Sequence, residues 1–154
     1  MFKRLRNYLD KRKVILAVGS FDERGLITAV EENDFYSIQV LLANGVDPNA
    51  KTERGVPVII RAISMGNLRV LEALLAAGAE TDLADREGQT PLMRAIEHGN
   101  KHVFLFFLNH ETDLEARDQK GDTALMKAAL AGSVRRVRVK SPSSLRSSTG
   151  SWRR

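Results

Sequence analysis

Three histidines, His98, His102 and His110, are the side chains best suited to metal binding or acid–base catalysis in this sequence. His98 and His102 have the i, i+4 spacing of two zinc ligands on a helix. However, Gly99-Asn100 predicts a turn between them, and no Glu follows the first histidine as a zinc protease requires. The chain has no cysteine, which excludes disulfides and cysteine-based zinc sites. We therefore expect surface histidines and no metal site.

Other catalytic patterns are also missing from the sequence. Serines gather in residues 141–151, where no base is placed to activate a hydroxyl. Glycines occur singly, about one in each predicted turn, so they form no phosphate-binding loop. Carboxylates fall mainly in predicted turns and on solvated helix faces, where nothing builds a pocket around a pair of them. We expect no enzyme activity and no cofactor.

The elements that would have to position any site recur every 33 residues. Glycines, alanines and a Leu-Leu pair all follow this step: Gly55, Gly88 and Gly121; Gly66, Gly99 and Gly132; Ala29, Ala62, Ala95 and Ala128; Leu41-Leu42 and Leu74-Leu75. A fixed period of this length predicts a stack of similar structural units.

Each unit reads as a turn followed by two helices. In the third unit Gly88 permits the turn, Thr90 can cap the first helix, and Pro91 suits its first position. Apolar residues then recur at helical spacing on one face of each of the two helices: Leu92, Ala95 and Ile96, then Val103, Phe104, Phe107 and Leu108.

These units resemble the ankyrin repeat. The matching motifs are Gln89-Thr90-Pro91-Leu92-Met93-Arg94-Ala95 and the Leu-Leu-x-x-Gly segments of residues 41–50 and 74–82, and the resemblance covers about residues 21–133. It implies an all-α solenoid of about three complete repeats and a truncated fourth. The family's usual histidine after Thr-Pro-Leu is Met93 here, and the third repeat has Glu111-Thr112-Asp113 in place of Gly-Ala-Asp. We therefore expect apolar packing at the first position and a less regular turn at the second.

The resemblance also implies where a partner protein would bind, namely on the turn tips and the first helices, which form the concave side of the solenoid. Carried over position by position, the candidate contact residues are Glu53, Arg54, Val56, Ser64, Met65, Arg86, Glu87, Gln89, Glu97, His98, Gln119, Lys120 and Asp122.

Both ends of the chain are basic. Residues 1–13 hold six Lys/Arg and one Asp, and residues 133–154 hold seven Lys/Arg and no acid, whereas residues 14–132 have a net charge of −7. Residues 1–20 are expected to form a basic helix, with Phe2, Leu5 and Leu9 on one face, that caps the first repeat. Ser20 and Glu23 are expected to form a capping box at the first repeat helix.

The fourth repeat loses its pattern after Gly132. No Leu-Leu pair follows, and residues 134–154 become a basic Ser/Arg-rich segment that composition predicts to be disordered. A truncated repeat predicts low stability or self-association, because the core of a solenoid needs a polar cap at its end.

The predicted function is non-catalytic binding of another protein. Two alternatives remain: electrostatic binding of nucleic acid or a membrane surface through the basic ends, and a truncated remnant of a longer ankyrin protein. No apolar run reaches the ~20 residues of a membrane span, so we expect a soluble, cytoplasmic protein.

Overall fold

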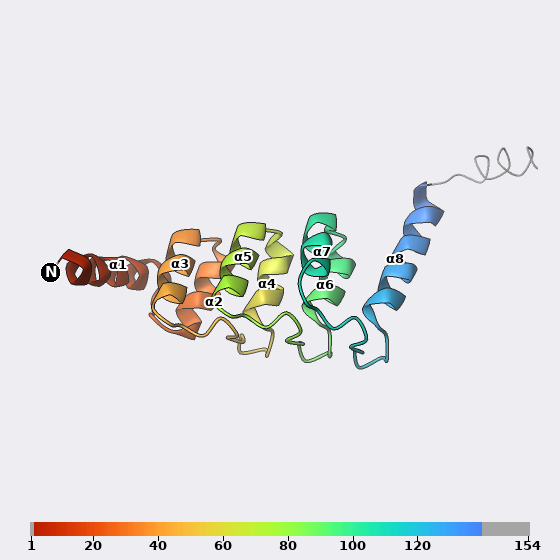
Figure 1. Ribbon diagram of the computed structural model, residues 1–154, viewed down its shortest axis with the longest axis horizontal. Coiled ribbons are helices and arrows are strands. Elements are labelled where there is room, and N and C mark those ends of the chain that lie inside the picture. Colours follow the sequence, from red (N-terminus) through yellow and green to blue (C-terminus); the bar gives the residue numbers. More distant parts are fainter. Residues whose placement is uncertain (1, 140–154) are drawn as a thin grey trace, which may run out of the picture.

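The computed structural model describes the backbone of residues 2–139 and the side chains of residues 10–132. Eight helices follow one another along this part of the chain: α1 (Phe2–Val18), α2 (Glu23–Glu31), α3 (Phe35–Ala43), α4 (Val58–Met65), α5 (Leu68–Ala76), α6 (Pro91–His98), α7 (Lys101–Leu108) and α8 (Ala124–Val139). They stack side by side into an elongated solenoid with α1 at one end and α8 at the other (Figure 1). None of these helices is long and apolar enough to cross a membrane.

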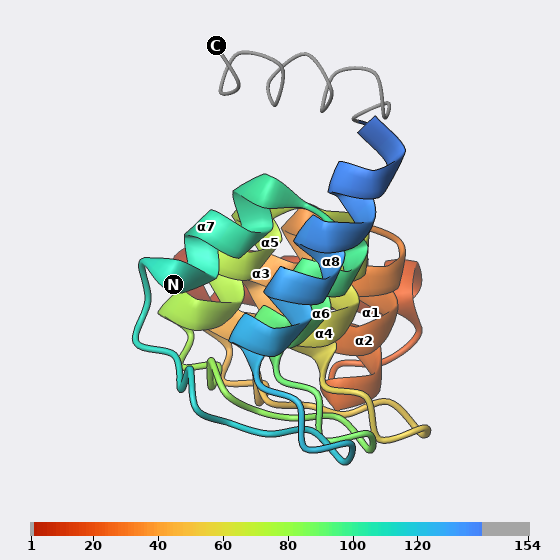
Figure 2. The ribbon, with the colours of Figure 1, turned by 90° about the vertical axis from the view of Figure 1, so that its right-hand side faces the viewer.

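The repeat helices form two layers. Viewed along the solenoid, α2, α4, α6 and α8 make the inner layer, and α3, α5 and α7 make the outer layer (Figure 2). Each helix packs against its neighbour in the same layer, α2 on α4, α4 on α6, α6 on α8, α3 on α5 and α5 on α7. Within residues 2–139, β pairing is limited to two isolated bridges, Lys51–Pro57 and Arg117–Thr123. The expected all-α solenoid is confirmed.

The inner helices begin at side-chain caps, as expected, with one difference. Thr90 caps α6 by accepting a hydrogen bond from the backbone N–H of Met93 at 3.4 Å. The capping box expected at Ser20 is wrong, because the cap of α2 is Asp22, which accepts the N–H groups of Arg24 and Gly25. The Ser20 hydroxyl instead donates to Asp22, so it supports the cap rather than forming it.

The break between the two helices of a repeat has a fixed construction. Gly66 and Gly99 end α4 and α6 in the left-handed conformation, and Asn67 and Asn100 then cap the outer helices. Asn33 takes the glycine position in the first repeat with φ +57°, the only positive φ outside glycine in residues 2–139. Asparagine tolerates this conformation better than most residues because its short polar side chain bonds locally.

The core runs through the solenoid between the layers. Its largest fully buried side chains come from every complete repeat: Leu26, Ile38, Leu41, Ile59, Ile63, Leu71, Leu74, Leu92, Met93 and Phe107. Met93 and Ile60, which replace the family's usual histidine, are 0% and 3% exposed. Apolar packing therefore fills this position, as expected.

Helix α1 lies against the first repeat. It packs on α2 and α3, and its Val14 and Val18 are buried. The Tyr36 hydroxyl donates a 2.6 Å hydrogen bond to Asp10 and so joins α3 to α1. The predicted face of Phe2, Leu5 and Leu9 lies outside the described side chains.

The third and fourth repeats depart from the pattern. In the first two repeats Gly45 and Gly78 turn the chain after the outer helix with positive φ, and Ala79 N–H, for example, bonds the carbonyl of Leu74. Glu111 cannot adopt this conformation cheaply, and the Thr112 hydroxyl bonds the Phe107 carbonyl instead. The less regular turn expected there is observed.

Helix α8 does not break at Gly132. It runs to Val139, through the boundary placed between residues 133 and 134, and Gly132 lacks the positive φ of Gly66 and Gly99. No Leu-rich segment follows Gly132 to pack back on the inner layer, so nothing favours a break. The predicted disorder of the C-terminal segment beyond residue 139 lies outside the described residues.

Candidate functional site: the fingers and the inner helices

Three turns project from the inner layer, and we call them the fingers: residues 52–56, 85–89 and 118–122. Each closes on itself through a pair of backbone hydrogen bonds, for example Asp118 N–H to the Asp122 carbonyl and Gly121 N–H to the Asp118 carbonyl. Glycine stands at the tight point of every finger, with φ between +72° and +82° at Gly55, Gly88 and Gly121. The fingers are therefore short, well-defined turns.

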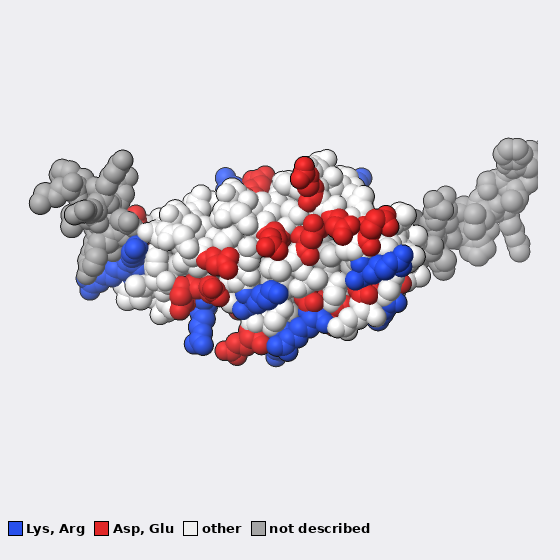
Figure 3. Space-filling model, turned by 60° about the horizontal axis from the view of Figure 1, so that its bottom comes forward, with Lys and Arg blue, Asp and Glu red and all other residues white. Residues whose placement is uncertain are grey.

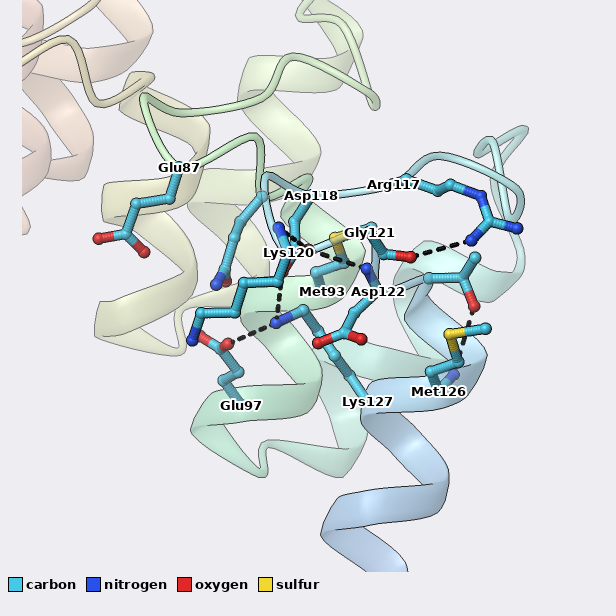
Figure 4. A network of polar contacts seen from close by, with 12 residues as sticks. Glu87, Met93, Glu97, Arg117, Asp118, Lys120, Gly121, Asp122, Met126 and Lys127 are labelled. Carbon is cyan, nitrogen blue, oxygen red and sulfur yellow. Dashed lines mark hydrogen bonds and ion pairs between the residues drawn. The ribbon is translucent and has the colours of Figure 1, made fainter.

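A buried aspartate holds each of the last two fingers. One oxygen of Asp118 accepts the N–H groups of Lys120 and Asp122, at 2.9 and 3.0 Å. Its other oxygen lies 2.9 Å from the ammonium of Lys127 on α8 (Figure 4). Asp85 repeats the arrangement one repeat earlier, with Arg94 of α6 at 2.6 Å. These side chains fix the fingers to the inner helices.

The cations also link successive repeats. The Lys127 ammonium bonds Glu97 of the preceding repeat at 3.0 Å, and Arg61 bonds Glu31 at 2.7 Å in the same way. Between them, Arg94 pairs within its own repeat with Glu87 and Glu97. The inner helices therefore carry a nearly continuous series of ion pairs.

Burial and charge act in opposite directions on these groups. The hydrogen bond from Lys127 outweighs burial and lowers the pKa of Asp118. Burial alone would raise the pKa of Glu97, but hydrogen bonds from Lys127 and Gln89 and the nearby cations lower it below its usual value. For Lys127 and Arg94, burial would lower the pKa, and the carboxylates reverse that effect and raise it. The series of pairs is therefore fully charged at neutral pH.

Neighbouring fingers are joined through their backbones. Gln119 N–H donates to the Glu87 carbonyl at 3.0 Å, and the Gln119 side chain donates to the Arg86 carbonyl. The Arg86 guanidinium donates to the Glu53 carbonyl at 3.3 Å. The three fingers thus form one connected edge that spans three repeats.

Most of the predicted contact residues lie on one exposed surface. Glu53, Arg54, Arg86, Glu87, Gln119 and Lys120 are exposed at the finger tips, Ser64, Met65, Glu97 and His98 are exposed on α4 and α6, and Val56 and Asp122 are partly exposed. Ser64 and His98 meet across the repeats, with Oγ and Nε2 3.3 Å apart. The structure therefore brings these residues of the fingers and first helices together into one strip.

Gln89 is the exception, and its expected place on the exposed turn tip is wrong. The residue is only 5% exposed, and its Oε1 has no hydrogen-bond partner. The finger folds back at this point, because Gln89 N–H bonds to Asp85 and its carbonyl accepts from Asp85 N–H. Gln89 therefore supports the finger and the Glu97 carboxylate from within.

The surface is hollowed where the first finger meets α2. A hollow of about 650 Å³ there is lined by side chains of both signs and by apolar groups: Arg24, Ile27, Thr28, Glu31, Thr52, Glu53, Arg54, Val56 and Arg61. Three of the predicted residues, Glu53, Arg54 and Val56, therefore share one concave feature. Seen from the finger side, carboxylates and cations alternate over the surface (Figure 3).

Sequence reasoning missed the residues that hold this surface in place. Asp85, Asp118, Arg94 and Lys127 were not identified as a set, although a usable signal was present. Asp85 and Asp118 are 33 residues apart, and a cation recurs at 61, 94 and 127. Within the described residues, no group of three or more His, Asp or Glu is arranged to hold a metal ion.

The stacked helix pairs with projecting fingers define a repeat protein of the turn–helix–helix class. The family model of ankyrin repeats, in three copies, matches residues 26–118. The chain belongs to the ankyrin-repeat family, whose members generally serve as protein–protein interaction modules and typically carry no catalytic chemistry. Among curated proteins, no significant match to this chain is found.

Proposed function

We propose that this chain binds a partner protein through the strip formed by the fingers and the exposed positions of α4 and α6. The observation that supports this most directly is the connection between neighbouring fingers, from Glu53 to Arg86 and from Glu87 to Gln119. A surface already held in one arrangement loses little conformational entropy on binding. It therefore suits recognition of a folded or extended polypeptide.

Met65 is the most informative residue of this strip. It is an apolar side chain, 49% exposed, on α4 beside polar neighbours such as Ser64. Large apolar groups that are buried at the centre of an interface contribute most of its binding energy. The alternating charges of the fingers would surround such a contact with a polar rim.

A pull-down from lysate at moderate salt tests the proposal with a matched pair of variants. Met65→Arg changes the strip, and Leu105→Arg changes a similarly exposed residue, 44% exposed, on the outer helix α7. We expect a specific protein to be retained by the wild type and by Leu105→Arg and lost by Met65→Arg. Nucleic acid or many acidic proteins, retained equally by all three chains and released by added salt, would instead indicate binding through the basic ends.

The compartment is part of the same proposal. Ankyrin-repeat proteins are often cytoplasmic, and we place this chain there. Fractionation of the native source with an antibody to the chain checks this placement.

A further inference from the structure

The C-terminal end of the solenoid exposes side chains that every other repeat buries. Leu125 is 77% exposed, whereas Leu92, one repeat earlier at the same position, is 2% exposed. Met126 is 49% exposed against 0% for Met93. The difference arises because α8 covers α6, while no further helix in the described chain covers α8.

These exposed residues form one face of α8. Leu125, Met126, Ala129 and Leu130 lie at i, i+1, i+4 and i+5 and all are exposed, with Leu130 at 68%. Positions with this spacing share one side of a helix. The face has the apolar character of an inner-helix contact, the kind that Leu92 and Met93 make inside the solenoid.

We propose that α8 of a second copy of this chain covers this face, giving a closed two-fold dimer. The opposite end of the solenoid is already covered by α1, whose Val14 and Val18 are buried. Head-to-tail stacking would need that end to be free. Pairing through the C-terminal ends alone is self-complementary, so it stops at two copies.

Charge selects the antiparallel arrangement of the two helices. Residues 133–139 carry three arginines and no acid, and residues 110–122, which lead into α8, carry five carboxylates and two cations. A parallel pair would bring the two arginine segments together, and like charges repel. An antiparallel pair brings each +3 segment beside the partner's −3 segment, with the two-fold axis near Ala129.

The oligomeric state of the purified full chain tests this inference. We expect a dimer by analytical ultracentrifugation, and a monomer for the Leu125→Glu/Leu130→Glu variant, with dissociation weakened at least about 100-fold in favour of the monomer because two buried leucines become charged. Leu16→Glu is the matched control, since Leu16 is 78% exposed at the other end on α1. A monomeric wild type, a dimer kept by the double variant, or open-ended assemblies would each overturn the proposal.

A cysteine probe tests the antiparallel geometry independently. The chain has no cysteine of its own, so a single Ala129→Cys reports only on itself. Near a two-fold axis it meets its own copy, and we expect a reducible cross-linked dimer under a mild oxidant, with Leu16→Cys remaining uncross-linked. An uncross-linked Ala129→Cys chain would contradict the antiparallel pairing. Neither measurement involves a partner protein, so failure here leaves the proposed function untouched.

Discussion

The ammonium of Lys127 lies 2.9 Å from Oδ2 of Asp118, and the other oxygen of that carboxylate holds two backbone N–H groups of the finger. The Asp118 side chain is 1% exposed and that of Lys127 is 10% exposed. One ion pair therefore connects a projecting turn to the helix behind it. The same nitrogen bonds Glu97, which extends the connection to the preceding repeat.

Removing this cation should loosen the fourth finger. In Lys127→Met the Asp118 carboxylate stays buried without its counter-charge, and leaving a buried charge unpaired is strongly destabilising. We expect a lower urea midpoint and faster hydrogen exchange at the amides of Lys120 and Asp122. Arg61→Met is the control, because the Arg61–Glu31 pair is 46% and 43% exposed, and exposed pairs contribute about 0–1 kcal/mol. Equal effects of the two substitutions would contradict this account.

The same carboxylates should make stability depend on acid pH. The pKa values of Asp118 and Glu97 are lowered in the fold, so the unfolded chain takes up their protons at a higher pH than the folded chain does. Their contribution is complete above the unfolded values, near about pH 4, and is lost as the pH falls through the folded values. We expect a flat urea midpoint from pH 7 to about 5 and a steep fall below about 4.

Lys127→Met provides the control for this pH effect. The variant lacks the hydrogen bond that contributes most to the lowered pKa of Asp118. Its urea midpoint should therefore fall less steeply with acid than that of the wild type. An identical acid dependence in both chains would mean that other carboxylates are responsible.

The buried methionine of the third repeat should matter far more than an exposed one. Met93 is fully buried between repeats, whereas Met65 is 49% exposed on α4. Met93→Ala should cost about 2–5 kcal/mol in the free energy of unfolding, because it leaves a cavity. Met65→Ala should change it by less than about 0.5 kcal/mol. Chemical denaturation of both variants checks the prediction, and similar losses would show that the two sites are not distinguished by burial.

Local features of the fold could be predicted from the sequence because they depend on residues close in the chain. Thr90 caps α6, and Gly66 and Gly99 end the inner helices, through hydrogen bonds and backbone conformations within a few residues. The 33-residue step determined the number and order of the units. Most of the contact strip followed from it, because equivalent positions in a solenoid lie on the same side.

Packing between repeats could not be read in this way. Gln89 occupies a turn-tip position by its spacing, yet the finger folds it inward beside Glu97. Lys127 meets Glu97 because α6 and α8 lie together, although 30 residues separate the two side chains in the chain. Contacts of this kind depend on how far each unit turns relative to the last, which no short segment encodes.

The sequence alone determined that this chain builds stacked turn–helix–helix units, because apolar spacing, caps and glycines act locally and recur with one period. Only the tertiary structure decided which side chains those units bury and which they leave open. Leu92 and Leu125 occupy the same position in successive repeats, yet one is 2% exposed and the other 77%. The physical reason is that burial belongs to the neighbouring helix as much as to the residue, and α8 has no such neighbour within the described chain.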